Sequence, residues 1–176
     1  MPPHLKSICS IWLQKHELRV KPSKCHLFRT QIEYVGHVVS AENVRPSHKK
    51  IAAVQDCLVP RTVKDVRAFW GFTGYYQRFV KDFTHIVNPL LELMKGVPSG
   101  AKKQEIQWGE RQEKVFQALK VALTEAPVLA YAEFSLPFIL HTDGSLLWLG
   151  AVLSQVQDGK ERVIAYASRS LQTESG

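Results

Sequence analysis

One aspartate of this chain stands where a carboxylate could hold a metal ion. Asp143 follows the apolar run Phe138–Leu140 and precedes Gly144, so it lies at or near the end of an expected strand. Phosphoryl transfer by two metal ions needs several acidic side chains around Mg²⁺ ions that lie about 4 Å apart. A strand-end or turn aspartate without a catalytic role would have the same surroundings. The residues alone therefore leave both interpretations of Asp143 open.

The basic residues of the chain are concentrated in its first two thirds. Residues 1–110 hold 17 Lys and Arg against nine Asp and Glu, a balance of +8, whereas residues 111–176 hold six against seven. A basic surface beside a carboxylate-containing module is typical of a protein that holds a polyanion, because phosphate contacts supply most sequence-independent affinity. A solvated basic face without a ligand would give the same balance.

The bulk composition indicates a globular protein with one domain or two small ones. Of the 176 residues, 45% are hydrophobic and 22% are charged. The longest apolar run, over 146–153, is too short to cross a bilayer, and the first residues lack the pattern of a signal peptide. We therefore expect an intracellular protein, in the cytoplasm or the nucleus, with no membrane partner.

Hydrophobic periodicity and turn signals predict the elements that position these residues. Helices are expected over 4–16, from Ser47 to Pro60 with Ile51, Val54 and Leu58 on one face, from Thr62 onward, from Asn88–Pro89 to Met94, and from Gly109 to Pro127. Strands are expected over 18–20, in a hairpin over 32–45 with its tip at 41–43, and over 138–140, 150–156 and 162–168. Asp158 and Gly159 between the last two runs are a strong hairpin signal.

The helix expected after Thr62 combines an apolar stripe with two glycines. Thr62 and Asp65 have the spacing of a capping box. The stripe at i, i+3, i+4 and i+7 consists of Val66, Phe69, Trp70 and Thr73. Gly71 and Gly74 interrupt the helix at about 1 kcal/mol each relative to alanine, which predicts close approach of a backbone or a ligand.

Several motifs occur in a fixed order along the chain: Tyr34–Ser40, Phe69–Phe79, and His141–Gly144 followed by Gly150. Together they resemble the reverse transcriptase and ribonuclease H region of the Pol polyprotein of gypsy-type LTR retrotransposons and related retroviruses. In that family they resemble, in turn, the primer-grip hairpin, the thumb and the first ribonuclease H strand. The resemblance covers nearly the whole chain.

The resemblance implies an α+β chain with a C-terminal palm hairpin, a helical thumb and the first three antiparallel strands of a truncated ribonuclease H-like (α/β) domain. The implied boundaries are 1–46 for the end of the palm with its primer-grip hairpin, 47–104 for the thumb, 105–130 for a connecting helix, and 131–176 for the N-terminal part of the ribonuclease H-like domain.

The resemblance also implies that hairpin and thumb hold an RNA–DNA hybrid or primer–template duplex. The residues expected to bind nucleic acid are Gly36, His37, Lys64, Arg67, Gly71, Gly74, Tyr75 and Arg78. Tyrosines could pack on sugars while lysines and arginines reach phosphates. Alternatively, the aromatic residues of this helix belong to the core, as helical aromatic stripes usually do.

For catalysis, the resemblance implies that Asp143 is a catalytic residue and a ligand of Mg²⁺, the cofactor of the parent enzyme. The parent activities are RNA-directed DNA polymerase and RNA–DNA hybrid endonuclease. This chain has no adjacent Asp pair for the first, and the further carboxylates of the second are expected beyond residue 176. We therefore expect a fragment that holds duplex, binds Mg²⁺ weakly and is inactive without the remainder of the Pol polyprotein.

Two features depart from the family pattern: the apolar run Leu146–Trp148, where polar or small residues are usual, and Trp70, where leucine is usual. Both are compatible with a decayed or repurposed copy. One alternative is therefore a domesticated, non-catalytic nucleic-acid binding protein. Another is an unstable relic of a degenerate element, since three strands with an open edge make an incomplete sheet.

Overall fold

The N-terminal part of the chain forms a compact unit of its own. The computed structural model describes residues 11–19, 21, 23, 25–26, 29–98 and 104–171. Contacts divide the chain into the units Met1–Ile32 and Glu33–Gly176. In the first unit, residues 11–15 are helical, which confirms the end of the helix expected over 4–16, while 4–10 lie outside the described residues. The strand expected over 18–20 is wrong, because the described residues Leu18 and Arg19 do not belong to a strand.

The first sheet contains four short strands among the described residues. These are β1 (Gln31–Tyr34), β2 (His37–Ser40), β3 (Asn43–Pro46) and β4 (Leu129–Ala130), in the order β1-β2-β3-β4. Strands β2 and β3 pair antiparallel with Val39 opposite Val44, so the predicted hairpin tip is confirmed. The two-residue strand β4 was not predicted, because a pair as short as Leu129–Ala130 carries no periodicity.

Helix α2 (His48–Gln55) is shorter than the sequence predicts. It begins after Ser47 as expected. The buried Ser47 Oγ, however, forms no N-cap hydrogen bond and has no hydrogen-bond partner among the described residues. Val54 is buried on the predicted face, whereas Leu58 lies beyond the helix end and is 85% exposed. The prediction that Leu58 belongs to the apolar face is therefore wrong, because the chain leaves the helical path after Gln55.

Helix α3 (Val63–Tyr75) begins with the predicted capping box. Thr62 Oγ1 accepts a hydrogen bond from the Asp65 N–H at 3.3 Å, and Asp65 Oδ2 accepts one from the Thr62 N–H at 2.9 Å. The Thr62 hydroxyl, which donates to Asp65 Oδ2 at 2.8 Å, is the main cause that lowers the pKa of Asp65. Against a rise from burial, the N–H groups of Arg61 and Thr62 and the charge of Lys64 lower it further. Trp70 was predicted on the apolar stripe but is 43% exposed.

After α3, the described residues form the 3₁₀ helix η2 (Gln77–Phe79) and the helices α4 (Phe83–Glu92) and α5 (Glu110–Thr124). The prediction that Asn88–Pro89 begins a helix is wrong, because α4 begins at Phe83 and Pro89 lies buried inside it. Asp82, with φ 54°, turns the chain immediately before α4. Helix α5 follows Gly109 as predicted, and it buries Phe116, Leu119 and Leu123.

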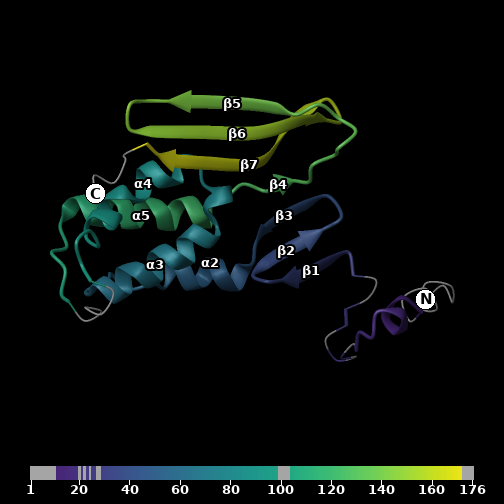
Figure 1. The fold of residues 1–176 in the computed structure, drawn as a ribbon, viewed down its shortest axis with the longest axis horizontal. Helices are drawn as coiled ribbons and strands as arrows, with labels where there is room; N and C mark the ends of the chain where they lie inside the picture. The colour runs from purple at the N-terminus through teal and green to yellow at the C-terminus, as the bar shows by residue number, and fades with distance from the viewer. Residues whose placement is uncertain are drawn as a thin grey trace. The chain divides into compact units, whose positions relative to one another are not determined.

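The second sheet contains β5 (Ile139–Gly144), β6 (Trp148–Gln157) and β7 (Lys160–Ser170) in sequence order, all antiparallel (Figure 1). Asp158 and Gly159 have φ of 52° and 74°, the signs that a type I′ hairpin turn requires. The three antiparallel strands are therefore confirmed. In Figure 1, β7 runs alongside α4, and Thr84 of α4 donates two hydrogen bonds to Ser168 of β7.

One hydrophobic core joins most elements of the second unit. Its buried members are Val44, Val54, Val66, Phe69, Tyr76, Phe79, Val80, Phe83, Val87, Leu90, Phe116, Leu119, Leu123 and Leu129. Val163 and Tyr166 of β7 pack against this cluster. The domain boundaries at 46/47, 104/105 and 130/131 stay a prediction. Within the described residues, no helix has the length and apolar character needed to span a membrane.

Candidate functional site

Two tyrosines at the end of α3 hold the turn between β1 and β2. Val35 and Gly36 have φ of 45° and 77°, so both turn residues are left-handed. The Tyr75 hydroxyl donates to the Val35 carbonyl at 2.9 Å, and the Tyr76 hydroxyl donates to the Gly36 carbonyl at 3.1 Å. A Cβ on Gly36 would lie 2.5 Å from the Tyr76 hydroxyl. Glycine is therefore required at position 36 by both its backbone and its neighbour.

His37 packs beneath this turn. Its Nδ1 lies 3.2 Å from the Val35 carbonyl, and its ring centroid lies 5.3 Å from the ring centroids of both Tyr75 and Tyr76. Burial lowers the pKa of His37 most. The bond to Val35 raises it by less, and the charge of Arg78 lowers it further. The neutral imidazole is thus favoured, and His37 supports the turn mainly by packing.

A cavity of about 420 Å³ lies between the β1–β2 turn and α3. It is lined by Val35, Gly36, Lys50, Gly71, Phe72, Tyr75 and Tyr76. Lys50 supplies its positive charge, with Nζ 5.8 Å from the centre of the Phe72 ring. We call this cavity the turn slot. Three of the residues predicted to bind nucleic acid, Gly36, Gly71 and Tyr75, meet there.

An exposed stripe of α3 leads to the turn slot. Lys64, Ala68, Gly71 and Tyr75 follow at i, i+4, i+7 and i+11, so they share one helix face, and all four are exposed. The small residues Ala68 and Gly71 leave a shallow path between Lys64 and Tyr75. Such a path lets an extended ligand approach the helix backbone closely.

The other predicted residues of α3 lie beside this stripe. Arg67 and Gly74 are half-buried, and Arg67 Nη2 donates to the Val97 carbonyl at 3.3 Å. No described atom comes within 4 Å of a Cβ built on Gly71 or Gly74. The predicted close approach of another backbone at these glycines is therefore wrong, and the predicted approach of a ligand stays a prediction.

Arg78 joins η2 to β7. Its Nη2 donates to the Ile164 carbonyl at 3.4 Å, and its guanidinium carbon lies 5.8 Å from the centre of the Phe79 ring. The side chain is exposed enough to contact a ligand as well. A role in nucleic-acid binding stays a prediction for this residue.

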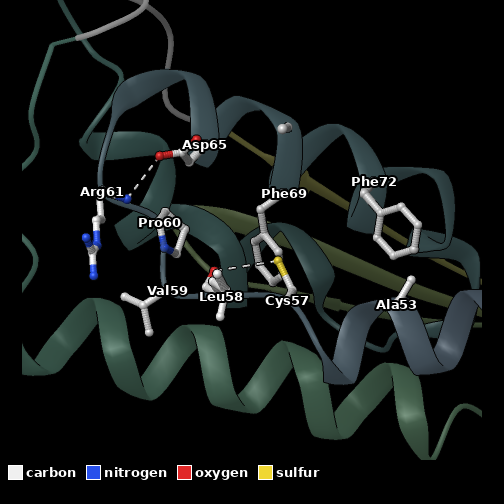
Figure 2. A pocket seen from close by; sticks show the side chains of 10 residues that line it. Ala53, Cys57, Leu58, Val59, Pro60, Arg61, Asp65, Phe69 and Phe72 are labelled. Atoms are coloured by element: carbon white, nitrogen blue, oxygen red, sulfur yellow. Dashed lines mark hydrogen bonds between the residues drawn. The ribbon is translucent and has the colours of Figure 1, made fainter.

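A second, apolar groove of about 870 Å³ lies between α2 and α3. Figure 2 shows Cys57, Phe69 and Phe72 around it, with Asp65 and Arg61 near one end. Burial raises the pKa of the Cys57 thiol, whose Sγ donates to the Leu58 carbonyl at 3.6 Å, so the thiol stays protonated. Phe72 lines both this groove and the turn slot. The two hollows therefore adjoin along α3.

Asp143 lies near the end of β5, opposite Gly150 of β6, and is exposed. A Cβ on Gly150 would lie 2.7 Å from Asp82 Oδ1, so a second carboxylate approaches the same pair of strands. The part of the chain that the structure describes nevertheless contains no group of three or more His, Cys, Asp or Glu placed to hold a metal. These residues do not fit a two-metal site, and the catalytic role of Asp143 stays a prediction.

Lys50 is the residue of the turn slot that sequence reasoning missed. Lys49 and Lys50 are adjacent and look alike in the sequence. Lys50, however, lies four residues before the buried Val54 and so shares its side of α2, whereas Lys49 is 84% exposed and pairs with Glu33 at 3.5 Å. That i, i+4 relation to an apolar residue was the signal that could have distinguished Lys50.

Comparison with known proteins gives matches over nearly the whole chain. The family model of the RNase H-like domain found in reverse transcriptase matches residues 108–175. The retrovirus-related Pol polyproteins of the Drosophila melanogaster transposons opus and gypsy are 37% and 35% identical over 90% and 88% of this chain. The chain spans only 16% and 15% of their lengths. An uncharacterized mitochondrial protein of Arabidopsis thaliana is 38% identical over 77% of this chain and 82% of its own length.

Solved structures match the fold. The foamy viral protease-reverse transcriptase in complex with double-stranded DNA aligns with a TM-score of 0.78 over 96% of this chain and 29% of that chain, at 22% identity. The same viral protein in complex with an RNA/DNA hybrid aligns with a TM-score of 0.76 over 96% of this chain and 22% of that chain. At this level of identity the likeness shows the fold.

Proposed function

This chain belongs to the reverse transcriptase and ribonuclease H-like region of retrotransposon Pol polyproteins, and on that premise we propose that it holds a nucleic-acid duplex for its parent enzyme. The parent activities would be RNA-directed DNA polymerase and RNA–DNA hybrid endonuclease. The partner would be an RNA–DNA hybrid or a primer–template duplex. In support, the similar viral protein was solved in complex with double-stranded DNA and in complex with an RNA/DNA hybrid.

The observation that carries this proposal is the exposed stripe of α3 ending at the turn slot. The stripe begins at Lys64 and ends at Tyr75, which contacts the β1–β2 turn. Between them, Gly71 has no side chain that would cover the helix backbone. Lys64 supplies a positive charge at one end of this path, and Lys50 of the turn slot supplies one at the other end. Positive charges can bind the phosphates of a nucleic-acid backbone, and the ring of Tyr75 can pack on a sugar. Gly36, His37, Arg67, Gly74 and Arg78 would complete the contact or support it from beside the stripe.

The chemistry of the parent enzyme requires more than these residues. We propose that Asp143 becomes a ligand of Mg²⁺ and a catalytic residue only when the remainder of the Pol polyprotein supplies further carboxylates. The Mg²⁺ would then assist hydrolysis of the RNA strand. Until then, the chain would bind duplex inside the cell without cleaving it.

A salt titration of duplex binding tests the proposal. A fluorescein-labelled RNA–DNA hybrid should bind the chain at low salt, with affinity that falls as salt rises. Lys64→Ala should lower the affinity for all sequences alike and reduce the slope of log K against log salt by about 1. Lys160→Ala, which removes the same charge at the start of β7, is the matched control and should leave the slope unchanged. If the wild-type chain binds no duplex at low salt, the proposal fails.

One observation favours a second candidate, a domesticated non-catalytic nucleic-acid binding protein. The Arabidopsis relative is matched over 82% of its own length, so most of this region also occurs apart from a long polyprotein. The discriminating experiment adds the downstream region of the opus polyprotein to this chain. Mg²⁺-dependent hybrid cleavage that disappears in Asp143→Asn would support the parent-enzyme role, and binding without cleavage would support the second candidate.

A further inference from the structure

We propose that the apolar groove between α2 and α3 binds a free medium-chain fatty acid, with the aliphatic chain along the groove and the carboxylate on the Arg61 guanidinium. This ligand differs from the duplex of the proposed function, and the inference does not rest on that function. Three features of the groove carry it: the apolar run that borders it, the unequal bonding of its two charged residues, and its size.

An apolar run of the chain between α2 and α3 borders the groove. The run is Cys57–Pro60, and within it Leu58 is 85% exposed and Val59 is 41% exposed. Phe69 and Phe72 of α3 stand on the opposite side of the groove (Figure 2). An aliphatic chain placed between the two sides would remove apolar surface from water on both, and this burial favours binding.

The two charged residues that line the groove, Arg61 and Asp65, differ in their bonding. Asp65 Oδ2 accepts three hydrogen bonds, from the N–H groups of Arg61 and Thr62 and from the Thr62 hydroxyl, at 3.2, 2.9 and 2.8 Å. The Arg61 guanidinium has no hydrogen bond or ion pair within the part of the chain that the structure describes. A carboxylate matches the fork of N–H donors on a guanidinium, so the charged end of the ligand belongs beside Arg61.

The other charges around the groove and the adjoining turn slot balance one another. Three are positive and three are negative: Lys50, Lys64, Lys120, Glu33, Asp56 and Glu105. Lys120 lies nearest to the groove wall, because its Nζ donates to the Cys57 carbonyl at 3.1 Å. Charges of both signs at similar range largely cancel, so the preference for an anion comes from direct contact with Arg61.

The groove has the size of a small-molecule site. Its volume of about 870 Å³ lies within the range of about 300–1,000 Å³ that is usual for ligand pockets. Ala53 and Ala68 line it with short side chains, and Phe72 is the lining residue that it shares with the turn slot. A single aliphatic chain with one carboxylate therefore fits the groove in size and in polarity.

The test titrates the chain with decanoate and with decanol, which has the same aliphatic chain without the charge, while NMR follows the methyl signals of Leu58 and Val59. Both compounds should shift these signals saturably, and decanoate should bind more tightly. Arg61→Gln should weaken decanoate binding about fivefold, the size expected of an exposed ion pair, and leave decanol binding unchanged. Arg169→Gln, the same charge change at an exposed position of β7, is the matched control and should leave both affinities unchanged.

A second variant blocks the groove itself. Ala53 is an exposed residue of α2 that lines the groove, so Ala53→Trp should fill the hollow with little effect on the core. Binding of decanoate and of decanol should then both be lost. A circular dichroism melt that matches that of the wild type shows that the variant folds, and unchanged binding of both compounds in the folded variant would place them elsewhere on the chain and overturn the proposal.

Three other results would contradict the proposal. Decanoate could leave the methyl signals of Leu58 and Val59 unshifted, or Arg61→Gln could bind decanoate as tightly as the wild type. In the third result, the same signals would shift with protein concentration in the absence of decanoate while sedimentation shows dimers, and a second copy of the chain would then cover the groove. The salt titration of duplex binding tests the proposed function separately from all of these.

Discussion

Gly36 and Gly71 both line the turn slot, but the fold requires glycine only at position 36. Gly36 is left-handed, with φ 77°, and is crowded by the Tyr76 hydroxyl, so the fold requires it. Gly71 lies in a helix with open space around it, so the fold would be more stable with alanine there. The open space at position 71 shows no packing partner among the described residues, and the ligand contact predicted for Gly71 stays a prediction.

Alanine substitutions at these two glycines should change stability in opposite directions. We expect Gly36→Ala to lower the free energy of unfolding by about 1–2 kcal/mol from the left-handed backbone alone. Gly71→Ala should raise it by up to about 1 kcal/mol, because alanine favours the helix. Urea unfolding followed by circular dichroism measures both. A stabilising Gly36→Ala would mean that the turn is not left-handed in solution.

At the scale of single residues, the sequence predicts which residues line a site better than it predicts which residues they hydrogen-bond. Gly36, Gly71 and Tyr75 were named from their motifs and meet in the turn slot. The bond from Arg78 to Ile164 was not predictable, because it joins residues 86 positions apart and depends on how β7 packs. Lys50 was missed because its neighbour Lys49 has the same chemistry, and only the register of α2 separates the two.

Helix α4 illustrates what decides an element's boundary. Asn88–Pro89 has the appearance of a helix start, yet the buried residues Phe83, Val87 and Leu90 form a stripe that begins five residues earlier. Proline removes one N–H and disfavours a helix interior, but burial of this apolar face outweighs that cost. By contrast, the Thr62–Asp65 box and the Asp158–Gly159 turn were predicted correctly, since their signals are local hydrogen bonds and backbone angles.

One serine of β7, Ser168, forms hydrogen bonds with α4 through its side chain. Ser168 Oγ accepts from the Thr84 N–H at 2.8 Å and donates to Thr84 Oγ1 at 2.9 Å. Ser168→Ala should lower the free energy of unfolding by about 1–3 kcal/mol, because it leaves a partly buried N–H without its acceptor.

Ser135→Ala is the matched control for that substitution. The exposed Ser135 donates to Glu133 Oε1, an exposed surface contact, so the change should stay within about 0.5 kcal/mol. Equal effects of the two serine substitutions, measured in urea, would show that the Thr84–Ser168 contact is not formed in solution.

Most elements of the second unit share one core, and this predicts how the unit unfolds. Residues of the first sheet, of α2 to α5 and of β7 contribute to a single cluster. We therefore expect residues 33–171 to unfold in one transition, with equal calorimetric and van't Hoff enthalpies and with equal exchange free energies for the most protected amides of α3, α5 and β6. An earlier transition confined to β5–β7 would instead favour autonomous domains with a boundary at 130/131.

The bonds from Tyr75 and Tyr76 also bear on how relatives of this chain can diverge. Both hydroxyls end on main-chain carbonyls, which every residue possesses. The shape of the β1–β2 turn can thus be inherited while the side chains around it change, provided that glycine stays at position 36 and the two tyrosines stay at the end of α3. A lineage could in this way exchange the side chains of the hairpin without rebuilding its geometry.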